Sequence, residues 1–309
     1  MYKYVIKRLL MLVFVIIGVS FLIYFIMDMA PGDLALTILG EEATQEELEA
    51  LRHELGLNRP VIIRYGEYMW NLLHGDLGYS QKYKMDVWEL YMQRLPATML
   101  LALSACIVAT ILSIPLGIVA ALTRGSLTDN VISGISVFGL AAPNFWVGLM
   151  LIIAFALHLG WFNSGGFQSL KDVVLPAITV GTAHMALVTR TTRSSMIDVL
   201  RSDYLLLARA KGVEEKKVIT KHALKNALIP IITVTGMQIG SSLGGSVVTE
   251  TVFSWPGVGR MIVESIRSQD VETVTGSIIM TSILTSLILL LVDILYAFVD
   301  PRIKAQYSK

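Results

Sequence analysis

Long apolar runs alternate with polar intervals along the 309 residues of this chain. The first run extends from Leu9 to about Met27 and holds about 19 residues, close to the roughly 20 needed to cross the hydrocarbon core of a bilayer. Five further crossings are predicted at 97–122, 131–159, from about 174 to a basic turn at Arg190 and Arg193, 229–248 and 278–299. The pattern predicts an all-α integral membrane protein with about six transmembrane helices.

The first run has a second interpretation as a cleavable signal peptide. It is longer than a typical signal core, and no small-x-small cleavage site follows it directly, so a retained first helix is favoured. The basic residues Lys3, Lys7 and Arg8 precede it and place the N-terminus in the cytoplasm. We therefore assign 1–28 to an N-terminal cytoplasmic tip and the first crossing.

Residues 29–95 form a polar, acid-rich excursion that predicts a small extracytoplasmic helical region. Thr44 and Glu47 have the spacing of a capping box, and a second helix is expected from about Pro60 to Leu73. The run 75–80, Gly-Asp-Leu-Gly-Tyr-Ser, favours a tight turn with a structural role. The remaining residues, 96–309, form the predicted core domain with five crossings and a cytoplasmic loop at about 198–228.

The interval 203–230 is polar and basic, yet it is rich in helix-forming residues. Gly212 is its one interior breaker, so we expect two short helices that meet at a glycine turn. Glu214 and Glu215 would open the second helix, at the positive end of its dipole. The interval is either an ordinary solvated loop or a protruding helical element that fits a groove on another protein.

Composition and charge agree with a membrane protein. The chain is 54% hydrophobic and 16% charged, with mean hydropathy +0.64, whereas soluble domains carry roughly a quarter charged residues. The net charge of +1 argues against a nucleic-acid partner, and the single cysteine, Cys106, excludes an internal disulfide. Sixteen of the 25 Lys and Arg lie on the side of the two termini, and 17 of the 24 acids lie on the other side. This distribution predicts that both termini are cytoplasmic.

The motifs expected of several enzyme classes are absent from the sequence. There is no Gly-x4-Gly-Lys-Ser/Thr phosphate loop and no His-Glu-x-x-His zinc motif, so no catalytic or metal-binding residues are assigned. An ion-coupled secondary transporter is not favoured, because such proteins keep several ionisable residues at mid-membrane and Asp293 is the only clear one here. A transporter with this sequence would therefore take its energy from a partner.

The fifth predicted crossing carries small and polar residues at helical spacing. Gly236, Gly240 and Gly244 recur every four residues, which allows another helix to approach closely. Gln238 and Ser241 lie on the same stretch. These five residues could serve helix packing, or could also line a translocation path, and the sequence leaves both interpretations open.

The basic interval resembles the cytoplasmic coupling loop of ABC importer permeases, in the branch that carries dipeptides, oligopeptides and nickel. The resemblance rests on Ala208-Arg209-Ala210-Lys211-Gly212 and on His222-Ala223-Leu224-Lys225-Asn226-Ala227-Leu228-Ile229-Pro230. The chain departs from the general family signature at four positions, Leu206, Leu207, His222 and Lys225. The resemblance implies a coupling site for an ATPase at Ala208, Arg209, Ala210, Lys211, Gly212, Val213 and Glu214.

A second stretch, Glu250 to Arg260, is similar to the part of these permeases that contributes to an external gate. The residues concerned are Glu250, Phe253, Trp255, Pro256 and Gly257, and the two aromatic rings would supply apolar bulk at the membrane interface. A further match runs from Leu291-Val292-Asp293 to Asp300-Pro301-Arg302.

The resemblance implies a type I ABC importer permease fold and a place in a larger assembly. The expected partners are a second homologous permease subunit, two ABC ATPase subunits and an extracytoplasmic substrate-binding protein. ATP and Mg would bind to the ATPases, with no cofactor on this chain. The implied function is import of dipeptides or oligopeptides by alternating access, at the cytoplasmic membrane of a bacterium or archaeon. Chelated nickel and glutathione-like peptides remain alternative cargoes.

Overall fold

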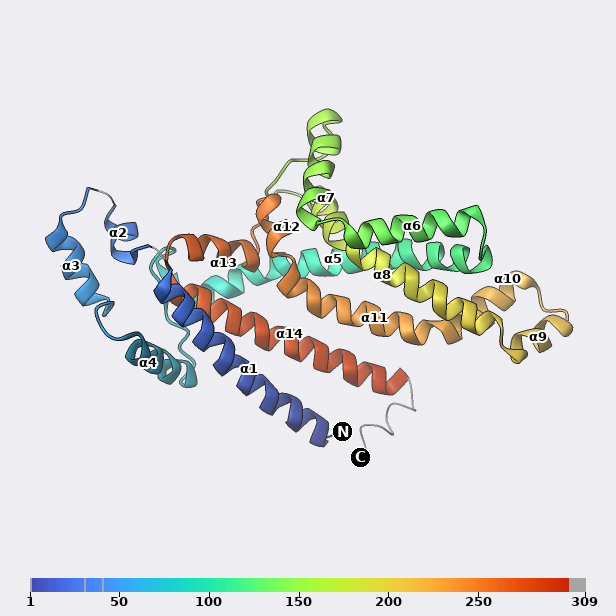
Figure 1. The fold of residues 1–309 in the computed structure, drawn as a ribbon, viewed down its shortest axis with the longest axis horizontal. Helices are drawn as coiled ribbons and strands as arrows, with labels where there is room; N and C mark the ends of the chain where they lie inside the picture. Colours follow the sequence, from blue (N-terminus) through green and yellow to red (C-terminus); the bar gives the residue numbers. More distant parts are fainter. Residues whose placement is uncertain (1, 31, 41, 300–309) are drawn as a thin grey trace. The chain divides into compact units, whose positions relative to one another are not determined.

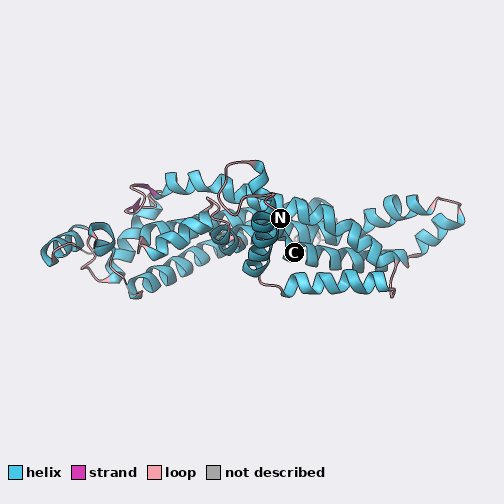
Figure 2. Ribbon diagram, turned by 90° about the horizontal axis from the view of Figure 1, so that it is seen from above, coloured by secondary structure: helices cyan, strands magenta, loops and turns pink. Residues whose placement is uncertain are grey.

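The computed structural model describes residues 2–30, 32–40 and 42–299, and the match through Asp300-Pro301-Arg302 lies outside them. Most of the described chain is helical, and its described strands are a single pair of two residues each (Figure 2). The contacts divide the chain into two compact units. Among the described residues, unit 1 comprises 99–255 and 287–299, and unit 2 comprises 2–98 and 256–286. Two long helices, α5 (Val87–Leu122) and α14 (Val271–Val299), contribute to both units.

Unit 2 contains the first helix and the region predicted to be extracytoplasmic. Thr44 caps α3 through the predicted capping box with Glu47, which confirms that local prediction. The helix expected at 60–73 is α4, and the turn after it leads into an antiparallel strand pair with Tyr79 opposite Asp86. The elements of unit 2 besides α5 and α14 are α1 (Tyr2–Met29), α2 (Leu34–Leu39), α3 (Gln45–Glu54), α4 (Val61–Leu73), β1 (Tyr79–Ser80), β2 (Met85–Asp86) and α13 (Val258–Arg267).

Unit 1 is built around α8, which packs beside α6 and α11 (Figure 1). Close packing is possible because α8 carries small side chains along its buried face, including Ala177, Thr179 and Ala186. The elements of unit 1 are α6 (Leu127–Ala141), α7 (Asn144–Leu151), η1 (Ile152–His158), η2 (Leu170–Val173), α8 (Val174–Leu200), α9 (Asp203–Ala210), α10 (Glu215–Lys217), η3 (Val218–Ala223), α11 (Leu224–Gly245) and α12 (Val247–Val252).

Five described helices are long and apolar enough to cross a membrane. Their spans are Leu10–Met29, Val87–Leu122, Leu170–Leu200, Glu215–Gly244 and Val271–Ile294. A sixth candidate is the pair formed by α6 and the α7–η1 segment, which bends by 106°. The expectation of about six crossings in an all-α fold is thus confirmed as five, or six if the bent pair is one span.

The prediction of one continuous helix over 131–159 was wrong, because α6 ends at Ala141 and α7 begins at Asn144. Proline has no amide hydrogen and disfavours helical geometry at the residue before it. Ala142 is accordingly extended, with φ −69° and ψ 127°, and Pro143 precedes the first residue of α7.

The fifth crossing also differs from its prediction at its start. The sequence placed its first residue at Ile229, but helical structure runs through α10, η3 and α11 from Glu215 onwards. Pro230 lies inside α11 without ending it. Such prolines are tolerated in membrane helices because neighbouring groups satisfy the freed carbonyl. The second helix of the basic interval and the fifth crossing therefore form one continuous helical segment.

Candidate functional site

The exposed end of unit 1 is a helix, a tight turn and a second helix, formed by α9, residues 211–214 and α10. Gly212 has φ +75°, in the left-handed region that glycine adopts without a steric penalty. Its amide donates to the Arg209 carbonyl at 2.9 Å, and the Val213 amide donates to the Ala208 carbonyl at 3.2 Å. These two bonds are those of a Schellman motif, which closes the C-terminus of α9. The glycine turn predicted between two helices is confirmed.

An ion pair spans this turn and ties the two helices together. The Arg209 guanidinium donates through Nε to Glu215 at 3.0 Å and through Nη2 at 2.8 Å. These hydrogen bonds raise the pKa of Arg209 above its usual value. Glu214 is the N-cap residue of α10 and is exposed, as predicted from its place at the start of the helix.

The buried side of the turn is fixed by an apolar cluster at the ends of α8 and α11. Leu205 and Val218 are fully buried in this cluster, and Ala208 and Val213 pack against it. Tyr204 adds a polar link, because its hydroxyl accepts a hydrogen bond from Asn226 at 2.8 Å. The turn is therefore held rigidly on its inner side by unit 1.

The outer side of the same turn is open to the surroundings. Ala210, Lys211 and Gly212 are exposed. Leu206 and Leu207 are 59% and 57% exposed, and they lie just before the predicted coupling residues 208–214. Their exposure follows from the helical register once Leu205 takes the buried position. A basic residue beside two exposed leucines forms a surface suited to a protein partner.

A buried ion pair supports the same end of unit 1, between the start of α6 and α8. Arg193 donates two hydrogen bonds to Asp129, at 2.6 Å and 2.7 Å. The Gly125 amide donates to the same carboxylate at 2.9 Å, and only 4% of the Asp129 side chain is exposed. The two partners of this ion pair lie 64 positions apart in the sequence.

The glycines of α11 pack against α14 within unit 1. A methyl group at Gly236 would overlap Val292, and one at Gly240 would overlap Leu289, so both glycines allow a close helix contact. A methyl group at Gly244 would have no neighbouring atom within 4 Å. Ser241 donates to the side-chain oxygen of Gln238 at 3.0 Å. The packing interpretation thus has direct contacts at two of the five predicted positions.

The residues of the predicted outer gate fall on both sides of the boundary between the units. Phe253 and Trp255 are buried within unit 1, with 1% and 0% exposure, so their rings pack inside the protein. Phe253 packs with Ile152 and Leu175, and the Trp255 ring lies 4.6 Å from that of Phe167. Glu250 is buried as well and accepts a hydrogen bond from Ser246 at 3.1 Å.

Pro256 and Gly257 belong to unit 2, because the boundary falls after Trp255. Gly257 is the N-cap residue of α13, and the amide of the next residue, Val258, donates to Thr98 at 2.8 Å. Each unit thus holds its part of the predicted gate through contacts of its own.

Two family models match this chain. The model described as binding-protein-dependent transport system inner membrane component matches residues 113–305, and the N-terminal model of the same kind of component matches residues 1–102. The chain belongs to this family. It is a permease subunit of an ABC importer and a multi-pass membrane protein, as the resemblance of the basic interval indicated.

Characterised members of the family align along nearly the whole chain. The dipeptide transport system permease protein DppB of Escherichia coli K12 is 37% identical over 98% of this chain and 99% of its own length. The oligopeptide permease AppB of Bacillus subtilis is 41% identical over 98% of this chain and 100% of its own. The glutathione permease GsiC of Escherichia coli K12 is 40% identical over 98% of this chain and 99% of its own length.

A solved structure supports the fold of this permease. Inward-facing conformations of the MetNI methionine ABC transporter include a chain with TM-score 0.58 and 18% identity. The match covers 68% of this chain and 96% of that chain. The expected type I ABC importer permease fold is thereby confirmed.

Proposed function

We propose that this permease forms one half of the membrane pore of an ATP-driven, binding-protein-dependent importer of dipeptides or oligopeptides. The observation that carries the proposal is the full-length similarity to dipeptide and oligopeptide permeases, 37% and 41% identical. The second half would be a homologous permease subunit. Two ABC ATPases would bind and hydrolyse MgATP on the cytoplasmic side, and an extracytoplasmic binding protein would deliver the peptide.

The turn at Ala208–Glu214 is the proposed contact for an ATPase. Its inner side packs on the apolar cluster of unit 1. A displacement of the turn would therefore also move α8 and α11, because packed side chains join them to the turn. Its outer side offers Leu206, Leu207 and Lys211 to a groove. Rigid coupling elements of this kind can transmit a conformational change because packed cores deform little.

The proposed transport cycle is alternating access. Closure of the ATPases would move the Ala208–Gly212 turn, open the outer gate near Phe253–Pro256, and later reset it. Part of the polar face of α11, including Gln238, Ser241 and Gly244, would line the path. Both termini and the turn would lie on the cytoplasmic side of the membrane, and the 29–95 region would lie outside. The charge distribution along the chain supports this orientation.

Gly212→Pro tests the coupling role of the turn. Proline fixes φ near −65°, whereas Gly212 has φ +75°, and proline also removes the amide that closes α9. Membrane insertion and the amount of protein should stay unchanged, because the turn is exposed. Peptide uptake in vesicles that carry the complete importer should fall to background. ATP hydrolysis should continue, but it should no longer be coupled to peptide uptake.

Gly212→Ala and Gly125→Ala form a matched control pair for this test. Both glycines have positive φ, +75° and +79°, and neither has an atom within contact distance of an added methyl group. Both substitutions therefore carry a similar backbone strain, but only Gly212→Ala alters the proposed coupling turn. Uptake at the wild-type rate in Gly212→Pro vesicles would refute the coupling assignment.

Glutathione-like peptides are a second candidate cargo, because the glutathione permease GsiC is 40% identical to this chain. Uptake of a radiolabelled dipeptide, with unlabelled glutathione and unlabelled tetrapeptide as competitors, separates the two cargoes. Competition by the tetrapeptide alone would support an oligopeptide importer.

A further inference from the structure

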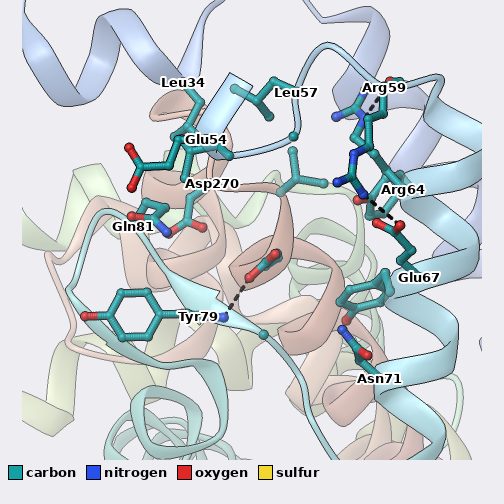
Figure 3. Close-up of a pocket in the computed structure, with 17 residues that line it drawn as sticks. Leu34, Glu54, Leu57, Arg59, Arg64, Glu67, Asn71, Tyr79, Gln81 and Asp270 are labelled. Atoms are coloured by element: carbon teal, nitrogen blue, oxygen red, sulfur yellow. Dashed lines mark hydrogen bonds and ion pairs between the residues drawn. The ribbon is translucent and has the colours of Figure 1, made fainter. Parts of the chain in front are cut away.

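Unit 2 contains a cavity of about 290 Å³ that none of the roles above uses. It lies between the end of α1, the turn after α3, α4, the strand β1 and the start of α14 (Figure 3). Its size is close to the lower end of the range for small-molecule sites in proteins. The polar part of its lining includes Glu54, Tyr68, Asn71, Tyr79, Asp270 and Glu272.

The charges around this cavity are not balanced. The two arginines of its lining already have partners, because Arg59 pairs with Glu67 at 2.8 Å and Arg64 pairs with Asp28. Three carboxylates of the lining remain without an ion pair among the residues that the structure describes, and they are Glu54, Asp270 and Glu272. The cavity therefore favours a cationic ligand.

Asp270 and Glu272 differ in how far their carboxylates are already satisfied. Asp270 is 2% exposed and accepts hydrogen bonds from Ser80 at 2.5 Å and Thr273 at 2.8 Å, so it serves mainly to hold β1 against α14. Glu272 accepts a bond from the Tyr79 amide at 2.6 Å. A carboxylate can accept about four hydrogen bonds, so Glu272 keeps capacity for a ligand.

Glu272 is also held in place by its surroundings. Gly78 lies directly against its carboxylate, and a methyl group there would overlap the oxygen. The strand residue Tyr79 then fixes that oxygen through its backbone (Figure 3). The carboxylate is thus positioned before any ligand enters, which lowers the entropic cost of binding.

Tyr68 provides an independent indication of a ligand. Its side chain lines the cavity with only 6% exposure, and its buried hydroxyl has no hydrogen-bond partner. Buried polar groups in folded proteins are almost always paired, so such a hydroxyl marks a place where a ligand or water completes the bonding. Burial, together with the nearby Glu272, raises the pKa of Tyr68.

The chemistry of the lining favours an ammonium group over a metal ion. Among the described residues no group of three or more His, Cys, Asp or Glu could hold a metal. Aromatic rings do line the cavity, and those of Tyr24 and Tyr68 lie 5.7 Å apart. Carboxylates combined with aromatic faces are the groups that bind organic cations.

We propose that this cavity binds the protonated amino group of a small organic ligand, with Glu272 as its counter-ion and the Tyr68 hydroxyl as a hydrogen-bond acceptor. The amino terminus of a short peptide has this chemistry. The ammonium site is supported by unit 2 alone, and only its occupation by a peptide rests on the proposed import function.

Calorimetry on the full chain in lipid nanodiscs, without ATPase or binding protein, tests this proposal. The probes are alanyl-alanine, its N-acetylated form, which lacks the charged amine, and putrescine, a diamine that is not a peptide. Alanyl-alanine should bind, and its acetylated form should not. Binding of putrescine but not of the dipeptide would support the ammonium site and overturn its occupation by a peptide.

Three variants assign the binding to the cavity. Glu272→Gln keeps an oxygen for the Tyr79 amide but removes the charge, so affinity should fall about tenfold or more, as for loss of a charge-assisted hydrogen bond. Tyr68→Phe should weaken binding about two- to tenfold without unfolding, because the lost hydroxyl makes no bond. Tyr65→Phe is the matched control on α4, since its hydroxyl bonds to Ser20 and Ile17 and does not line the cavity.

The proposal is overturned if the acetylated dipeptide binds as tightly as the free one. It is also overturned if Glu272→Gln and Tyr68→Phe both bind as the wild type does, or if no probe binds in the millimolar range. ATP-driven uptake by the complete importer is measured in parallel. Normal peptide uptake without binding of any amine probe would contradict the cavity site and leave the proposed function standing. Binding of the amine probes without peptide uptake would contradict the proposed function and leave the cavity site standing.

Discussion

Gly117 shows how one small residue sets the spacing of two helices in unit 1. A methyl group at this position of α5 would lie 2.5 Å from the Thr192 Cβ and 2.8 Å from the Thr189 carbonyl oxygen, both in α8. The carbonyl belongs to the backbone, so the clash cannot be relieved by a rotamer change. Glycine is therefore required here for close approach rather than for an unusual backbone angle.

Gly117→Ala should destabilise the permease by about 1–3 kcal/mol, the usual cost of overpacking a well-packed contact. Gly134→Ala is the matched control, because Gly134 lies in α6 and has no atom within contact distance. Alanine there should be neutral or slightly stabilising, through its better helix propensity. Thermal unfolding in detergent measures both, and equal melting temperatures would contradict the close approach of α5 and α8.

Residue-scale features were predictable from the sequence where neighbours in the chain determine them. The capping box at Thr44 and the turn at Gly212 depend on residues within four positions, and both are present. The exposure of Leu206 and Leu207 was not predicted. It depends on which face of α9 packs against Val218 and Met196, and short-range patterns carry no information on that face.

At the scale of elements, the pair Asp129 and Arg193 connects the start of α6 to α8. The carboxylate is almost fully buried and is bonded at both oxygens, whereas the arginine side chain is 30% exposed. Removing one partner of a buried pair leaves the other charge uncompensated, and this costs more than the pair itself contributes.

Arg193→Gln should therefore lower the melting temperature, by less than for a fully buried pair because solvent reaches the arginine. Asp129→Asn should cost a similar amount, and the double variant should cost much less than the sum of the two. A double-mutant cycle on the melting temperature measures this coupling. Additive effects of the two substitutions would show that the ion pair does not connect the helices.

Element boundaries were predictable only in part. Hydropathy located every long apolar run, but it treated 131–159 as one crossing because a bend does not change the average hydropathy. Pro143 was visible in the sequence, yet prolines are tolerated in membrane helices, so its presence alone did not predict a 106° bend. The merging of α10 with α11 was missed for a related reason, since the polar stretch before Ile229 does not end a helix.

At the scale of the whole molecule, the membrane class and the number of crossings follow from composition and hydropathy, which average over many residues. The two compact units do not follow from them, because each unit joins segments that lie far apart in the sequence. The cavity of unit 2 is an example, since Ser80 bonds to Asp270 across 190 positions. The division of the chain at 28 and 95 by membrane topology stays a prediction.

The central claim is that this permease works only with partners that supply energy and substrate. Affinity purification of the tagged subunit from its native membrane, in mild detergent and with mass spectrometry of the co-purifying proteins, tests this directly. We expect a second, homologous permease and at least one ABC ATPase in stable proportion. Recovery of the subunit alone, or only as a homo-oligomer without an ATPase, would contradict the account.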